Sequence, residues 1–184
     1  MALADFDFQP ISNTTDLTNF DCEDADINAF LKEDAINYFK EKMASTYIFM
    51  DGVNVVAFFS ISNNCLKDLG EANVFTRWVW DKLHKETKIP YHKRVKQYPA
   101  ILIGRLGVDK KYHGTGIAYE LMDFIKGWVL VGHKPACRFL ILDAYNQERQ
   151  IKYYVKNSFI FLLKEDIDHK TRTMYFDMMA LDIE

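Results

Sequence analysis

Apolar residues recur along this chain with two different periods, and the periods divide it into expected strands and helices. Alternating or continuous apolar runs rich in β-branched and aromatic residues predict strands. These runs are Phe6–Ile11, Thr46–Met50, Asn54–Ser62, Ile101–Val108, Arg138–Ala144, Phe159–Leu163 and Thr173–Met178. Asp51-Gly52 between the second and third runs signals a hairpin, and the last two runs are expected to form another.

Apolar residues at helical spacing predict amphipathic helices between these strands. The first follows a capping residue, Asp24 or Asp26, and its apolar stripe is Ile27, Phe30, Leu31, Ala35, Tyr38 and Phe39. Further helices are expected within Val74–Leu83, over Gly116–Val131 before Gly132 and Pro135, and over Gln147–Asn157.

The most informative local pattern is a glycine-containing loop between the strand ending at Val108 and the helix that follows. The first turn of a helix has unpaired backbone N–H groups, and its dipole favours negative charge. Gly114 and Gly116 let the backbone approach a ligand closely. The loop therefore predicts a phosphate or pyrophosphate site; the alternative is a strand–turn–helix junction whose glycines serve packing alone.

Two common phosphate motifs do not fit this loop. A P-loop needs Lys-Ser or Lys-Thr after its last glycine, and here Ile117-Ala118 follow. A dinucleotide-binding turn needs a third glycine, and the corresponding position is Tyr119.

The wider pattern resembles the GNAT family of acetyl-CoA-dependent N-acetyltransferases. Leu106-Gly107-Val108 matches the family's Leu-x-Val-like triplet. The loop from His113 to Ala118 matches its Gln/Arg-x-x-Gly-x-Gly/Ala pattern, with His113 in place of Gln or Arg. The family's Asn after the fifth strand is matched by Asn146, and its Phe/Tyr-Tyr helix by Tyr153-Tyr154, with Ser158 where glycine is common. The resemblance covers about Phe6 to Leu181.

The resemblance implies an α/β (α+β) GNAT fold as a single domain over residues 1–184. Its mixed, mostly antiparallel sheet would have six to seven strands with four or five flanking helices, and strands four and five would splay apart. It implies acetyl-CoA as the acetyl donor and no metal. The residues implied to bind acetyl-CoA are Leu106, Gly107, Val108, His113, Gly114, Thr115, Gly116, Ile117, Ala118 and Asn146.

Two segments resemble a narrower subgroup that contains the acetyltransferase toxins of toxin–antitoxin pairs. Phe20–Leu31 is similar to that subgroup's Phe-x-Cys-Gly…Leu-x-x-Phe-Leu opening, and Ile103–Asp109 to its Leu-Gly-Arg-Leu-Ala-Val-Asp strand. Those toxins acetylate the amino group of aminoacylated tRNA and are inhibited by a small antitoxin. The subgroup implies tRNA and an antitoxin as partners, and a homodimer stays open.

The family's chemistry assigns further roles along the chain. The backbone N–H near Val108 is suited to stabilise the thioester oxyanion. Tyr154 matches the family's proton donor to the leaving thiolate, with Tyr153 as the competing assignment. No general base is evident, because Arg105 stays protonated and His113 is expected to touch phosphate or solvent. A covalent route through Cys137 is the less favoured alternative.

The sequence leaves open which amine accepts the acetyl group, and whether the protein is an enzyme or a binding module. An α-amino group, with a pKa of about 7.7–8.0, needs less help to lose its proton than a lysine at about 10.4, so the missing base favours an α-amine. The alternatives are a small amine, a peptide N-terminus, or a non-catalytic CoA-binding module, which the departures at His113 and Ser158 would permit.

Composition agrees with a compact cytoplasmic enzyme. The 184 residues are 49% hydrophobic. The chain has 23 basic and 26 acidic residues, and its net charge of −3 gives no indication of a nucleic-acid partner. Cys22, Cys65 and Cys137 lack metal-site or disulfide spacing, and neither a secretion signal nor a membrane span is expected. Arg77–Lys96 is locally basic and aromatic, which fits either nucleic-acid contact or a solvated cover over the sheet.

Overall fold

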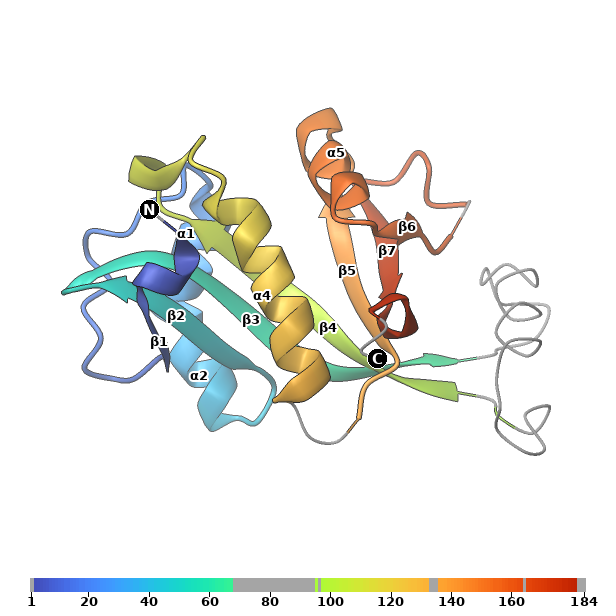
Figure 1. The fold of residues 1–184 in the computed structure, drawn as a ribbon, viewed down its shortest axis with the longest axis horizontal. Coiled ribbons are helices and arrows are strands. Elements are labelled where there is room, and N and C mark those ends of the chain that lie inside the picture. The colour runs from blue at the N-terminus through green and yellow to red at the C-terminus, as the bar shows by residue number, and fades with distance from the viewer. Residues whose placement is uncertain (1, 68–94, 96, 133–135, 164, 182–184) are drawn as a thin grey trace. The chain divides into compact units, whose positions relative to one another are not determined.

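The computed structural model describes residues 2–67, 95, 97–132, 136–163 and 165–181 (Figure 1). Seven strands form one sheet in the order β1-β2-β3-β4-β5-β7-β6. Their bounds are β1 Asp7–Pro10, β2 Ser45–Asp51, β3 Asn54–Lys67, β4 Gln97–Val108, β5 Phe139–Tyr145, β6 Ile160–Phe161 and β7 Thr171–Asp177.

The sheet is mixed and mostly antiparallel, which confirms the predicted sheet. Among the pairings that the structure defines, the parallel one joins Ala100–Leu102 of β4 to Phe139–Ile141 of β5. β5 and β6 both pair antiparallel with β7, so the terminal hairpin is also confirmed.

The chain divides into two compact units, each described by itself. Unit 1 comprises Met1–Asn63 and Ile103–Gly132, and unit 2 comprises Asn64–Leu102 and His133–Glu184. β3 and β4 each contribute residues to both units. The single-domain expectation stays a prediction.

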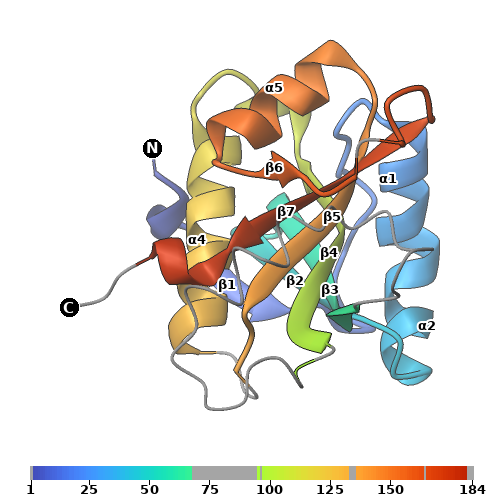
Figure 2. The ribbon, with the colours of Figure 1, turned by 90° about the vertical axis from the view of Figure 1, so that its right-hand side faces the viewer.

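Unit 1 places helices on both faces of its strands (Figure 2). Neighbouring residues of a strand point to opposite faces. Phe58 of β3 packs against Phe20 and Phe30 of the N-terminal segment, whereas Phe59 packs against Trp128 of α4. α4 spans Ile117–Val131, and its four fully buried side chains each contribute about 1.5–3 kcal/mol on burial: Ile117, Leu121, Met122 and Ile125.

The first predicted helix is interrupted by a π-helical turn. α1 spans Ala25–Ala29, the π turn η2 spans Phe30–Asp34, and α2 spans Ala35–Lys40. Asp24 caps it through a 3.1 Å bond from the Ile27 N–H, as expected. The predicted stripe is wrong in its last turn, because Tyr38 and Phe39 are 45% and 50% exposed. A π turn has more residues per turn than an α-helix, so it shifts the positions of the following residues around the helix axis.

Unit 2 is built around β5 and β7. Its core contains Leu66, Tyr98, Ala100, Phe139, Ile141, Leu162 and Tyr175. Arg138 and Asp177 form an ion pair of 2.8 Å beside this core. α5 spans Glu148–Lys156 and follows β5 as predicted.

Two strand lengths differ from their predictions. β3 continues to Lys67 rather than ending at Ser62, because hydrogen bonding to β4 supports the backbone even where side chains are polar. The run Phe159–Leu163 forms a strand only at Ile160 and Phe161, although the Leu162 N–H still donates to the Thr173 carbonyl at 2.9 Å. The helix expected in Val74–Leu83 and most of the basic segment lie outside the described residues.

Candidate active site

The loop after β4 has the backbone that the glycine pattern predicts. A short 3-10 turn, Lys110–Tyr112, leads into His113, and α4 begins at Ile117. Gly114 and Gly116 have φ values of +77° and +97°, a left-handed region that residues with a Cβ adopt at a cost. No atom would lie within 4 Å of a Cβ at either position, so the loop is open on that side.

Unpaired backbone donors gather at this loop. The N–H groups of Gly114, Gly116 and Ile117 donate to no acceptor among the described residues. Gly116 caps α4 without a side-chain hydrogen bond. The N-terminal end of a 15-residue helix therefore presents free donors and the positive end of its dipole, which suit a pyrophosphate group.

Buried Asp109 anchors the start of this loop. Its side chain accepts N–H bonds of 3.0 Å from Asp21 and Lys111, and its own N–H donates to the Val56 carbonyl at 2.8 Å. The Lys110 ammonium bonds the Asp21 carboxylate at 2.8 Å, and this contact is the main reason that the pKa of Asp21 lies well below its usual value. The loop is thus fixed to the chain segment that precedes α1.

These contacts bring together the two segments that resemble the toxin subgroup. Asp109, from the second segment, bonds Asp21 of the first. A Cβ at Gly107 would lie 2.9 Å from the Phe58 ring and 3.4 Å from the Phe20 ring, so the strand passes these rings very closely. The Arg105 guanidinium lies 5.6 Å from the centre of the Phe30 ring. The two motifs are therefore parts of one packed substructure.

The His113 ring lies between two protein groups. Its Nε2 lies 2.9 Å from the Val108 carbonyl oxygen, and its Nδ1 lies 3.6 Å from the Glu23 carboxylate. Both ring nitrogens therefore face protein groups, while 29% of the side chain remains exposed, and the expected contact with phosphate stays a prediction. A direct contact between His113 and a phosphate would require the ring to turn.

Unit 2 holds the proposed acid, Tyr154. Its ring packs edge-on against Phe159, with centroids 6.0 Å apart, and against Tyr153 at 5.0 Å. The residue as a whole is half-buried, but burial of the phenol raises the pKa of Tyr154 to about 12. Its hydroxyl has no hydrogen-bond partner among the described residues. The hydroxyl therefore stays protonated at physiological pH and is available as a donor.

Ser158 explains why glycine is common at its position in the resembling family. Its φ is +64°, and it ends α5 with N–H bonds from Ser158 to Val155 and from Phe159 to Tyr154. A serine can adopt this left-handed conformation at a cost of about 1–2 kcal/mol, so the departure changes strain rather than the path of the chain.

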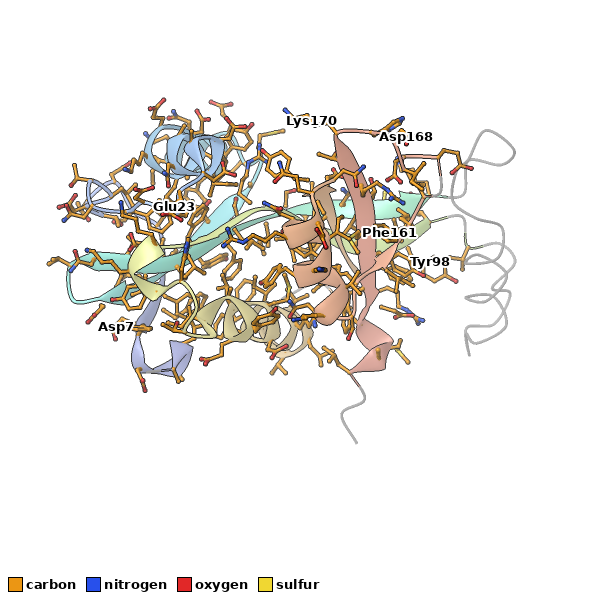
Figure 3. All side chains as sticks on the ribbon, turned by 90° about the horizontal axis from the view of Figure 1, so that it is seen from above. Asp7, Glu23, Tyr98, Phe161, Asp168 and Lys170 are labelled. Carbon is orange, nitrogen blue, oxygen red and sulfur yellow. The ribbon has the colours of Figure 1, made fainter. Side chains whose placement is uncertain are left out.

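Asn146 has a structural role that the sequence did not indicate. Its side-chain N–H groups bond the carbonyls of Ile167 and His169 at 2.7 and 3.0 Å, and its backbone N–H bonds the Lys170 carbonyl at 2.9 Å. The β6–β7 loop, where Asp168 and Lys170 are labelled in Figure 3, is thus tied to the end of β5. The side-chain carbonyl of Asn146 accepts no hydrogen bond among the described residues, so it could make the predicted contact with acetyl-CoA.

Buried Asp166 holds the same loop from within. Its carboxylate accepts from the Arg172 guanidinium at 2.6 Å and from the Thr173 N–H at 2.7 Å. No sequence motif marked this pair, because its members are ordinary charged residues separated by a turn.

Replacing Cys137 by Ser is expected to leave turnover within about twofold of wild type. Burial raises the pKa of the Cys137 thiol, whose Sγ donates to the Phe139 carbonyl at 2.9 Å, and only a thiolate is nucleophilic. Steady-state kinetics would check this. Loss of activity together with an isolable acetyl-enzyme would instead establish a covalent route.

Among the described residues, no three His, Cys, Asp or Glu side chains cluster as a metal site would require. Within the same part of the chain, every helix is too short or too polar to cross a bilayer.

No protein-family model matches this sequence. Solved structures do match it over nearly its whole length. AtaT complexed with acetyl-methionyl-tRNAfMet is 19% identical, with 96% of each chain covered and a TM-score of 0.67. A Tyr-to-Phe mutant of the toxin AtaT, bound to acetyl-CoA and the C-terminus of the antitoxin AtaR, is 17% identical, with 96% of this chain and 95% of that chain covered and a TM-score of 0.64.

A Tyr-to-Phe mutant of KacT is 21% identical, with 95% of this chain and 96% of that chain covered and a TM-score of 0.62. The chain therefore has the same fold as AtaT and KacT, which confirms the mixed α+β fold expected from the sequence.

Proposed function

We propose that this protein is an N-acetyltransferase that moves an acetyl group from acetyl-CoA directly to a primary amine, with the α-amine of aminoacyl-tRNA as acceptor. The main support for the use of acetyl-CoA is the loop at the start of α4. Its unpaired N–H groups at Gly114, Gly116 and Ile117 and its left-handed glycines suit the pyrophosphate of CoA. AtaT, which shares the fold, has been solved with acetyl-CoA.

The donor side follows from β4 and α5. Main-chain groups of Leu106 and Val108 would pair with the pantetheine amides, and the Val108 N–H would stabilise the oxyanion that forms as the amine attacks. The protonated Tyr154 hydroxyl would donate to the departing thiolate. Both AtaT and KacT have been solved as Tyr-to-Phe mutants, which accords with a tyrosine of importance in such proteins.

The acceptor proposal has three supports. AtaT has been solved with acetyl-methionyl-tRNAfMet, and the two toxin-like segments of this chain form one packed unit around Asp109. The described residues supply no evident general base on β4, which suits an α-amine whose pKa is about 7.7–8.0. These supports also imply a cytoplasmic protein, because charged tRNA and acetyl-CoA are found there, and a small inhibitory partner like the antitoxin AtaR that binds AtaT.

Mass spectrometry of the amino acid released from charged tRNA after incubation with acetyl-CoA would test the acceptor. We expect N-acetylated aminoacyl species and stoichiometric release of free CoA. Efficient acetylation of a polyamine or peptide with none of a charged tRNA would support a small-amine enzyme instead. Binding of acetyl-CoA without turnover on any amine would support a CoA-binding module.

Replacing Lys93, Arg94 and Lys96 by Glu is expected to weaken tRNA binding and to flatten its dependence on salt. These residues lie outside the described part of the chain, so the prediction rests on the basic, aromatic sequence. Each lost phosphate contact removes about 0.7–0.9 from the slope of log K against log salt concentration. Filter binding across a salt series would measure it, with acetylation of a small amine as the control that should not change.

A further inference from the structure

The two positions at which this chain departs from the resembling patterns near the pyrophosphate loop contact one another. His113 stands where the family has Gln or Arg, and Glu23 stands where the toxin-like opening has glycine. The His113 Nδ1 lies 3.6 Å from the Glu23 carboxylate. Ninety residues of sequence separate them, so only the fold joins them.

Glu23 is a costly residue at its position. It lies on the loop before α1 (labelled in Figure 3) with φ of +64°, a left-handed conformation that favours glycine. Its side chain is 62% exposed and that of His113 is 29% exposed, and an exposed pair of this kind contributes little to folding stability. Folding stability alone would favour glycine at position 23. The presence of a carboxylate there therefore points to a role other than stability.

His113 fixes the last peptide of β4. A carbonyl oxygen can only accept a hydrogen bond, so Nε2 carries the proton in its 2.9 Å contact with the Val108 carbonyl. The N–H of the same peptide, at Asp109, donates to the Val56 carbonyl at 2.8 Å. The peptide that follows Val108 is therefore held at both ends, and His113 supplies the link between it and the glycine loop.

The Glu23 carboxylate faces the other side of the ring. With Nε2 committed to Val108, only Nδ1 faces the carboxylate, and the contact becomes an ion pair when the ring carries both protons. The other charged groups around this point are Asp21, Asp109 and Lys110. They bond one another or backbone N–H groups, and Lys110 is also attracted to the Glu23 carboxylate. Glu23 is thus the carboxylate that remains for His113.

We propose that Glu23 and His113 form a brace that positions the pyrophosphate loop against the end of β4, so that His113 acts as a positioning residue and not as a phosphate ligand. The inference rests on the proposed binding of acetyl-CoA. In this arrangement the His–Glu pair positions the loop, as Gln or Arg opposite glycine would in the family's pattern. Replacing both residues together should therefore preserve the loop's position, whereas replacing only one should not.

The test is a pair exchange measured by calorimetry with acetyl-CoA. We expect His113→Gln and Glu23→Gly each to raise the Kd about three- to tenfold, the range that corresponds to loss of one hydrogen bond or weak ion pair. The double variant His113→Gln with Glu23→Gly should return the Kd to within about twofold of wild type, because the amide can still donate to Val108 and no unpaired carboxylate remains. For each variant, the change in kcat at saturating acetyl-CoA should be smaller than the change in Kd, as expected for residues that position the loop.

Lys42→Gly is the matched control. Lys42 is also a left-handed non-glycine residue, with φ of +60°, but its ammonium lies over the Phe39 ring at the end of α2. It should relieve similar strain without changing the affinity for acetyl-CoA. If the two single substitutions simply add, so that the double variant binds worst, the brace is wrong. If wild type binds acetyl-CoA and all variants bind equally, the brace is likewise wrong; if wild type itself does not bind, the proposed function fails and the brace with it.

Discussion

Replacing Gly116 by Asp is expected to weaken the binding of acetyl-CoA about 100-fold. The substitution places a carboxylate at the first turn of α4, where the N–H groups of Gly116 and Ile117 are unpaired. Like charges about 5 Å apart at an effective dielectric constant near 20 repel by about 3 kcal/mol, which corresponds to about a 100-fold loss of affinity. Isothermal titration calorimetry would measure it directly.

The control for this substitution must carry the same backbone strain. Gly116 has φ of +97°, so any side chain there is strained even though the surrounding space is open. Gly116→Asn has the shape of Asp without its charge, and Asn tolerates left-handed backbone better than most residues. The difference in Kd between the Asp and Asn variants therefore isolates the electrostatic effect. Equal affinities of a folded Asp variant and wild type would mean that the loop is only structural.

Replacing Tyr154 by Phe is expected to lower kcat about 100- to 1000-fold while leaving the Kd for acetyl-CoA nearly unchanged. Removal of a donor to the leaving group has effects in this range. The ring packing against Phe159 would be kept, because Phe preserves the aromatic contact. Steady-state kinetics with calorimetry on the same preparations would separate turnover from binding.

The raised pKa of Tyr154 sharpens this expectation. A phenol whose pKa is about 12 remains neutral until the pH approaches that value, so ionisation of Tyr154 should produce no fall in kcat at physiological pH. Because a thiol has a pKa of about 8.5, complete proton transfer from such a phenol to the thiolate is uphill, and a strong hydrogen bond to the departing sulfur is the main contribution expected.

Tyr153→Phe is the matched control on the same helix. It should change kcat by less than about threefold, because Tyr153 is expected to pack as the family's common Phe does. Exchange of the two phenotypes would assign the acid to Tyr153. If neither substitution affects kcat, thiolate leaves without help from either tyrosine.

Local sequence chemistry specified much of the structure before any contact was known. The left-handed φ values of Gly114 and Gly116, the Asp24 cap and the two-residue turn after Asp51 all follow from residues whose backbone preferences act over a few positions. The alternation of Phe58 and Phe59 between faces follows in the same way from the period of a strand.

A local irregularity of the backbone and contacts between distant residues account for what the sequence did not show. The π turn at Phe30–Asp34 changed the phase of a stripe that a constant period had extended to Phe39. Asn146 marked a family position, but its amide bonds carbonyls at Ile167 and His169, more than twenty residues away. Such pairings do not follow from the local backbone preferences of the residues involved.

The sequence by itself determined the order of elements, the seven strands and the glycine loop that opens α4, because periodicity and backbone preference are local properties. Only the tertiary structure decided that Asp109 bonds Asp21, that Gly107 passes close to Phe20, and that His113 lies between Val108 and Glu23. These contacts depend on which segments the sheet brings together. A contact between residues ninety positions apart in the sequence therefore cannot be predicted from local sequence patterns.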